Sequence, residues 1–173
     1  MIRHVLSLVF GLLLLATQAG CNVAQSIAQE IAKDHLLSEI DAAESRWQEQ
    51  NITNYRIVVR SASVWHLQTD TIIVHGGTVT EHSASCLNAL LERDGECEIE
   101  PIDPQTRTVE GLFAKARDLV DLAASGDSII YVMDGISFEF DPIYSYPELI
   151  ASSPPNAYDA AWGWIVEEFE VLS

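Results

Sequence analysis

Positive charge is scarce in this chain of 173 residues. Nine lysine and arginine residues stand against 26 aspartate and glutamate residues, which gives a formal net charge of −17 at pH 7. A surface with this charge repels nucleic-acid phosphates and anionic lipid headgroups. We therefore exclude nucleic acid as a partner, and we expect any contact with a membrane to come from a covalent lipid rather than from a basic patch.

The sequence also lacks an apolar run long enough for a comfortable membrane span. Residues 5–16 are almost entirely apolar, with Arg3 before them and small residues leading to Cys21 after them. An apolar core of about 7 to 15 residues between a basic residue and small residues indicates a secretory signal peptide, whereas a spanning helix needs about 20. The segment therefore predicts export from a bacterial cytoplasm.

Two cleavage sites compete at the end of this signal. Cleavage after Gly20 makes residues 1–20 a lipoprotein signal peptide and leaves Cys21 first, with a diacylglycerol on its sulfur. Cleavage after Ala19 releases a plain secreted protein, and an uncleaved segment acts as an anchor. Gln18 stands where lipoprotein signals normally carry leucine, but the Ala-Gly-Cys step favours lipidation. We predict a lipoprotein anchored to a membrane of the cell envelope through Cys21, periplasmic or on the outer surface.

Only three cysteines are present, and lipidation accounts for one of them. Cys86 and Cys97 remain as an even pair in an oxidising compartment, where such pairs form disulfides. Two buried free thiols are the alternative. A bond here would close a short loop, which the chain-entropy relation values at roughly 3 kcal/mol.

Apolar spacing divides the rest of the chain into helices and strands. Residues 22–50 contain no Pro or Gly and repeat apolar side chains every three or four positions, which indicates an amphipathic helix. Thr108 and Glu110 suit the start of a second helix, and Gly126 suits its end. Runs rich in β-branched or alternating residues predict strands over Tyr55–Val64, Asp70–Val74, Thr78–His82, Ser128–Met133, Ile136–Phe140, Glu148–Ser152 and Trp162–Leu172.

The order of these elements predicts the fold class. It runs helix, strands, helix, strands, with hairpin turns and without alternating βαβ units, after the signal peptide. This order favours an α+β fold in which two helices pack on one face of an antiparallel sheet. No Ser-rich or Gly-rich linker divides the mature chain, so we predict one α+β domain over residues 21–173, of which residues 21–31 serve partly as a tether to the lipid.

Three motifs carry a resemblance to a known family. They are Trp47 with the run Asn51–Arg56, then Thr108–Phe113, then Phe140-Asp141-Pro142 followed by Tyr146-Pro147. In this order they resemble an uncharacterised family of bacterial secreted lipoproteins, a domain of unknown function whose turn usually reads Tyr-Asp-Pro and then Gly-Tyr-Pro. The resemblance spans about residues 47–169. It implies a lipoprotein with an α+β fold, and it implies no activity.

Two departures from the family pattern limit what the resemblance implies. Many members carry Cys-x-Cys just after the first strand, where this chain has Ser61-Ala62-Ser63. Any role of that cysteine pair therefore does not transfer. In addition, the usual glycine of the turn is Ser145.

No catalytic constellation stands out in the sequence. There is no Gly-x-Ser-x-Gly elbow, and among 26 carboxylates no acid/base pair is singled out. His66, His75 and His82 fall in the first group of strands, but their spacing matches no compact metal motif. The acidic stretch around residues 92–96 lacks the ligand spacing of an EF-hand. We therefore predict no catalytic residue, no metal and no cofactor.

Trp162 and Trp164 flank Gly163 in the last predicted strand. Alternation places both indoles on one face, and a bulge near Glu167–Glu168 would return Phe169 to that face. Large aromatics usually pack in the core, so we expect both rings to lie beneath the helices. An aromatic platform for a ligand is the alternative.

The sequence leaves the function unknown but favours one class. We expect a lipid-anchored cell-envelope domain that binds an envelope protein or a small ligand without catalysis. The alternative is a metal- or thiol-dependent envelope enzyme centred on His75, His82 and Cys86.

Overall fold

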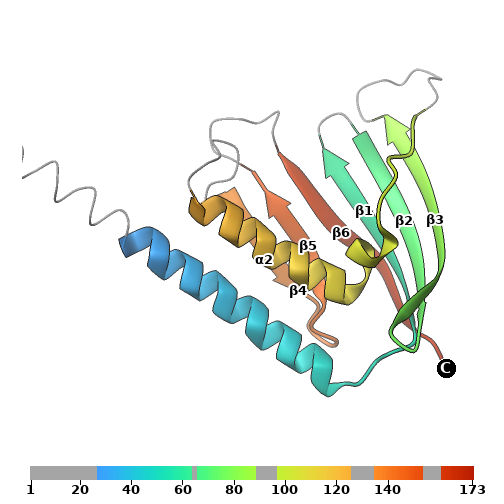
Figure 1. Ribbon diagram of the computed structural model, residues 1–173, viewed down its shortest axis with the longest axis horizontal. Coiled ribbons are helices and arrows are strands. Elements are labelled where there is room, and N and C mark those ends of the chain that lie inside the picture. The colour runs from blue at the N-terminus through green and yellow to red at the C-terminus, as the bar shows by residue number, and fades with distance from the viewer. Residues whose placement is uncertain (1–26, 64–65, 89–96, 126–134, 154–160) are drawn as a thin grey trace, which may run out of the picture.

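Two helices lie on one face of an antiparallel sheet (Figure 1). The computed structural model describes residues 27–63, 66–88, 97–125, 135–153 and 161–173. The predicted signal peptide, Cys21, Gly126 and the expected strand Ser128–Met133 lie outside these residues. None of the helices in the described ranges is long and apolar enough to cross a membrane.

The sheet consists of two three-stranded meanders joined at its centre. Its strand order is β3-β2-β1-β6-β5-β4, and every neighbouring pair is antiparallel. The first and last strands, β1 and β6, therefore pair in the middle of the sheet. The strands are β1 (Tyr55–Ser63), β2 (His66–His75), β3 (Thr78–Asn88), β4 (Ile136–Phe140), β5 (Pro147–Ser152) and β6 (Trp162–Val171).

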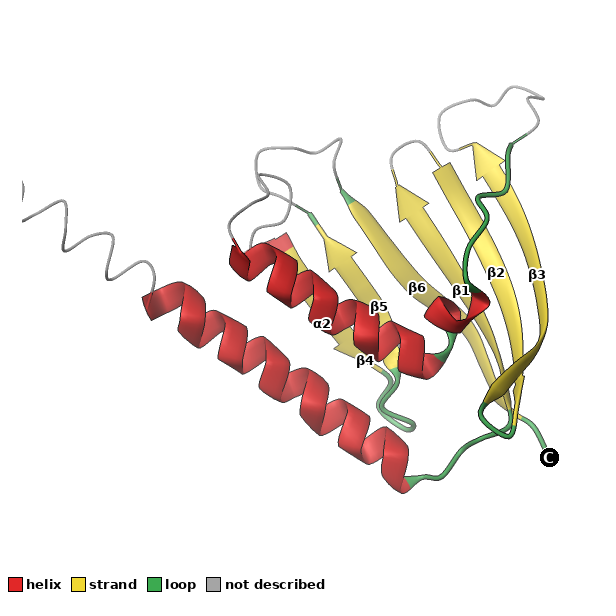
Figure 2. Cartoon of the chain, in the orientation of Figure 1, coloured by secondary structure: helices red, strands yellow, loops and turns green. Residues whose placement is uncertain are grey.

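The helices run side by side in opposite directions (Figure 2). The first helix covers residues 27–49, and α2 covers Val109–Ser125, directly after the short 3-10 helix η1 (Pro104–Arg107). Two ion pairs join the long helices along the C-terminal half of α2: Lys33 lies 2.7 Å from Asp121, and Arg117 lies 2.7 Å from Asp41. We call the side of the sheet beneath them the helix face.

The core lies between the helix face and the two helices. Each helix contributes the apolar stripe that its spacing predicts, and each strand contributes alternate residues. Burying such side chains stabilises the fold by about 1.5 to 3 kcal/mol each. Its fully buried large side chains include Ile40, Tyr55, Ile57, Val59, Ile72, Leu112, Phe113, Val120 and Ile150.

The predicted bulge in the last strand is confirmed. Val58 pairs with Glu168 and Val59 pairs with Val166, so Glu167 is the extra residue. The bulge turns Phe169 back to the helix face, where its ring contacts several aromatic side chains. These are Trp47, Tyr55, Tyr144 and Tyr146.

The α+β class, the antiparallel sheet and the two helices are as predicted, but β2 and β3 are longer than expected. The predicted strand at Asp70 begins at His66, and the one at Thr78 continues to Asn88. The apolar alternation fails in the added part of β2 because Gln68 occupies a buried position there. The added part of β3 belongs to an edge strand, which needs little apolar alternation.

Candidate functional site

A buried carboxylate on the helix face connects three elements of the structure. The side chain of Asp70 in β2 is fully buried (0% exposed). His82 Nε2 of β3 lies 2.9 Å from its Oδ1, and Arg107 Nε of η1 donates to its Oδ2 at 3.4 Å. Gln68 Nε2 donates to the same carboxylate at 3.2 Å. A buried charge requires such partners, so this cluster ties η1 to the sheet.

Gln68 also fixes the segment that leads into η1. Its Oε1 accepts a hydrogen bond from the Glu100 backbone N–H at 2.8 Å, and its Nε2 donates to the Glu100 carbonyl at 3.2 Å. The Asp103 carboxylate then caps η1 by accepting the Gln105 N–H at 3.0 Å. These hydrogen bonds fix the position of η1, from which the Arg107 side chain extends toward Asp70.

The guanidinium of Arg107 lies over an indole ring. Its guanidinium carbon lies 3.7 Å from the ring centroid of Trp164, and the residue is only 6% exposed. Burial lowers the pKa of Arg107, while the charge of Asp70 opposes that shift. The Nε atom is bonded to Asp70, but the two terminal nitrogens make no hydrogen bond within the described ranges.

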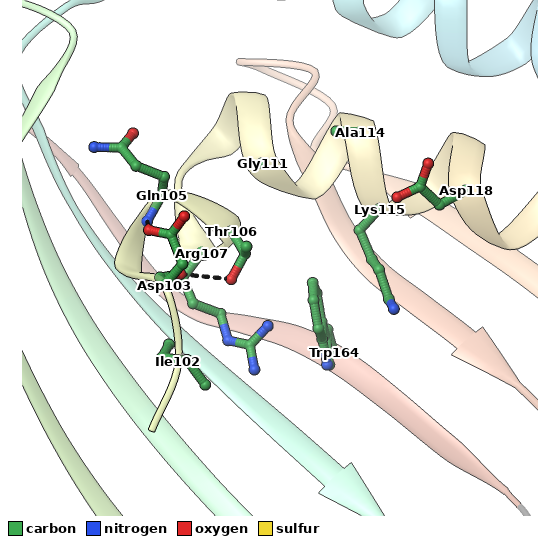
Figure 3. Close-up of a pocket in the computed structure, with 10 residues that line it drawn as sticks. All are labelled: Ile102, Asp103, Gln105, Thr106, Arg107, Gly111, Ala114, Lys115, Asp118 and Trp164. Atoms are coloured by element: carbon green, nitrogen blue, oxygen red, sulfur yellow. Dashed lines mark hydrogen bonds between the residues drawn. The ribbon is translucent and has the colours of Figure 1, made fainter. Parts of the chain in front are cut away.

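Lys115 approaches the same indole from α2. Its Nζ lies 5.0 Å from the centroid of Trp164 and 5.3 Å from that of Trp162. Burial lowers the pKa of this half-buried ammonium, and the charge of Asp118 opposes the shift. No carboxylate in the described part of the chain lies within 4 Å of Nζ, and Asp118 points away from it (Figure 3).

These side chains line a cavity of about 500 Å³ between η1, α2 and β6. Figure 3 shows the Trp164 ring between the side chains of Arg107 and Lys115. Ile102 and Ala114 add apolar surface to the lining. Small-molecule sites typically have about 300 to 1,000 Å³ and a few convergent polar groups, so the arrangement is suited to binding.

The two tryptophans fit neither of the sequence-based alternatives completely. Both lie on the helix face and pack against the core, as predicted. They are partly exposed, however, and Trp164 also forms a wall of the cavity. The reason is that α2 packs on β4 and β5, while the side chains of Arg107 and Lys115 cover this part of β6.

The structure places Cys86 and Cys97 at disulfide distance, with Cα atoms 5.8 Å apart. Cys86 pairs with Gln68 on the neighbouring strand, and Cys97 opens the segment toward η1. A bond between them would join β3 to the segment that Gln68 also holds. A sulfur in such a bond would supply no thiolate for the thiol-enzyme alternative.

The three strand histidines do not converge. His66 and His82 lie on the helix face about six strand positions apart, which corresponds to roughly 20 Å. His75 is exposed on the opposite face, next to the β2–β3 turn. Within the residues that the structure covers, no group of three His, Cys, Asp or Glu side chains is placed to hold a metal ion.

The residues behind the family resemblance build a tight turn between β4 and β5. Asp141 Oδ1 accepts the backbone N–H groups of Ile143 at 2.9 Å and Tyr144 at 2.5 Å. Ser145 has a φ of 63°, in the left-handed region that favours glycine. Its hydroxyl accepts a hydrogen bond from Arg46 Nε at 3.1 Å. None of these turn residues is among those that line the cavity described above.

Sequence reasoning missed Asp70, Arg107 and Lys115 as site residues. One signal was available: Gln68 and Asp70 alternate with Ile72 and Val74, so two polar residues share a buried face with apolar ones. A buried polar residue in a strand calls for a partner, but the sequence does not say which one.

Together, the fold and the cavity define a small α+β protein whose described residues form an antiparallel sheet with an indole-walled pocket on its helix face, lined by two cations and two carboxylates. The chain belongs to a family of unknown function, DUF6174, whose model matches residues 39–171. This confirms the predicted membership in an uncharacterised family, while the lipoprotein character stays a prediction. No curated protein and no solved structure matches the chain.

Proposed function

We propose that this chain is a lipid-anchored domain of the bacterial cell envelope that binds a small ligand without catalysis. The observation that carries the binding function is the cavity beside Trp164, in which a buried arginine presents donors that have no partner in the described ranges. The terminal nitrogens of Arg107 are not among the fully buried unpaired atoms of the described residues, so a ligand acceptor in the cavity can reach them and form a charge-assisted hydrogen bond.

The lining of the cavity supports binding rather than chemistry. Arg107 is held by Asp70, and Lys115 projects from a helix over two indoles. Neither forms the nucleophile–base pair that covalent catalysis requires. We therefore assign the cavity to recognition.

The cavity can be tested with a fragment set of mixed charge. Tryptophan-labelled protein would report contact through the Trp164 indole N–H resonance, which a Trp164→Phe variant identifies. Ala114→Phe should fill the cavity from the exposed side of α2 and abolish the shifts. Ala42→Phe, at an exposed position of the first helix, is the matched control and should leave them unchanged. Fragments that bind Ala114→Phe as well as the parent protein would contradict the assignment.

The anchor is supported by the Ala19-Gly20-Cys21 step after the apolar run. Cys21→Ser should move the protein from the membrane fraction to a soluble or unprocessed form and should abolish labelling with a radioactive fatty acid. Cys97→Ser is the control, because it removes a different cysteine and should keep the label. A Cys21→Ser protein that is labelled and fractionates with membranes would reject Cys21 as the lipid site.

A further inference from the structure

We infer that the pocket takes a small organic carboxylate, whose oxygens accept hydrogen bonds from the terminal nitrogens of Arg107, while the ammonium of Lys115 on the other side of the Trp164 ring attracts its negative charge. This inference rests on the proposed binding function and specifies the ligand of that same cavity. It follows from three features: the orientation of Arg107, the missing counterion of Lys115, and the limited net charge of the lining.

Arg107 is oriented before any ligand arrives. Its Nε is bonded to the buried Asp70, and its guanidinium carbon lies 3.7 Å from the centroid of the Trp164 ring. These two contacts do not use the terminal nitrogens, and Arg107 lines the cavity. A guanidinium presents paired N–H donors whose spacing matches a carboxylate, and such bidentate pairs are short and strong. The folded protein therefore already holds the Arg107 side chain in place, and ligand binding does not have to offset the entropy lost in ordering it.

Lys115 supplies a second charge without a close partner. Its ammonium lies about as near to Trp162 as to Trp164, and the indole rings attract it only weakly compared with a carboxylate. The nearest helix carboxylate, Asp118, points away in Figure 3. Because burial has already removed part of the water around Nζ, its charge is weakly screened and attracts a carboxylate bound at Arg107 across the indole.

The charge of the lining favours a monoanion over a dianion. Arg107 and Lys115 share the lining with Asp103 and Asp118, so the lining charges cancel, and Asp70 adds a negative charge beside Arg107. A second negative charge on the ligand would meet these carboxylates. Ile102, Ala114 and the edge of Trp164 instead suit an apolar body. Inorganic phosphate therefore fits less well than an aromatic carboxylate.

The test uses four probes of matched size or charge: benzoate, benzamide, benzylamine and inorganic phosphate. Calorimetry and the Trp164 indole resonance should show benzoate binding about tenfold or more tightly than benzamide, the ratio expected for one charge-assisted contact. Lys115→Met keeps the apolar stem and should weaken benzoate by about the same factor. Lys33→Met removes a surface lysine and should change nothing.

The outcomes separate the ligand class from the binding function. Benzamide or benzylamine binding as tightly as benzoate would overturn the carboxylate inference and leave the pocket a binding site. Preferred binding of phosphate would overturn it equally. If benzoate does not bind at millimolar concentration, the inference is wrong, and the fragment screen then decides whether the binding function stands. Arg107→Lys offers a second check, because it keeps the charge and loses the fork, and it should weaken benzoate in a protein that thermal melting shows to be folded.

Discussion

The indole nitrogen of Trp47 donates a hydrogen bond to a carboxylate oxygen of Glu110 at 3.2 Å. The Tyr55 hydroxyl donates to the other oxygen at 2.9 Å and accepts the Val109 N–H at 3.1 Å. One carboxylate in the first turn of α2 thus joins the first helix, β1 and α2. The macrodipole of α2 favours a negative charge at this position as well.

Glu110→Ala should therefore destabilise the fold by about 1 to 3 kcal/mol, because it leaves two donors without their acceptor. Glu110→Gln keeps one good acceptor and should cost less. The control is Asp121→Ala, which also lies on α2 and removes a surface ion pair with Lys33 of the first helix. It should cost less than about 1 kcal/mol. Urea denaturation measures all three. Equal losses for Glu110→Ala and Asp121→Ala would show that Glu110 has no bridging role.

Gly111→Ala should destabilise the protein although alanine is the better helix former. A Cβ at this position would overlap the Gln105 carbonyl oxygen and lie 2.7 Å from the Thr106 carbonyl carbon. Since both are backbone atoms, η1 would have to move away from α2. The gain in helix propensity, about 1 kcal/mol, is too small to compensate. Thermal melting should show a lower midpoint; a midpoint equal to or above the parent value would refute the steric argument.

Asp70→Asn should be strongly destabilising, by about 3 to 5 kcal/mol, because it leaves the buried Arg107 without its countercharge. The double change Asp70→Leu/Arg107→Met removes both partners. It should cost less stability than the sum of the single changes Asp70→Leu and Arg107→Met. Glu168→Gln, which weakens an exposed pair with Arg56, serves as the surface comparison. A double-mutant cycle measures the coupling. Strict additivity would mean that the two side chains do not stabilise each other.

The Cys86–Cys97 bond should appear as one joined peptide pair in mass mapping of the non-reduced mature protein. Its removal in Cys86→Ser/Cys97→Ser should cost roughly 3 kcal/mol by the loop-entropy relation. Purified protein in which both thiols react with an alkylating reagent before unfolding would contradict the pairing.

Stability should fall at alkaline pH because of buried tyrosines. Burial raises the pKa of Tyr146 to about 12, and the charges of Asp141 and Glu148 add to the effect. An unfolded tyrosine loses its proton near pH 10, so the folded state binds more protons between about pH 10 and 12. The stability from this group is complete below pH about 10 and is lost as the pH rises toward 12. The Tyr146→Phe variant should lose less stability than the parent protein between about pH 8 and 11. Urea midpoints measured at both pH values would show the difference. An identical loss in the two proteins would exclude Tyr146 as a cause of the alkaline destabilisation.

Local patterns were sufficient for several parts of this fold. The apolar repeats of residues 27–49 and 109–125 indicate both helices, because burial on one face imposes a period near 3.6 residues. Alternation placed Trp162 and Trp164 on one face, and the bulge was predictable because two consecutive glutamates interrupt the alternation. The antiparallel class followed from hairpin turns, whose signals are also local.

The pocket could be recognised only in the tertiary structure. Asp70, Arg107 and Trp164 come from β2, η1 and β6, and they meet because β1 pairs with both β2 and β6 while η1 is fixed to β2 by Gln68. Periodicity reports which residues face inward, but it carries no information about which distant side chain they will face. The sequence alone therefore determined the helices and the sheet class, whereas the partner of each buried charge was decided by long-range strand pairing.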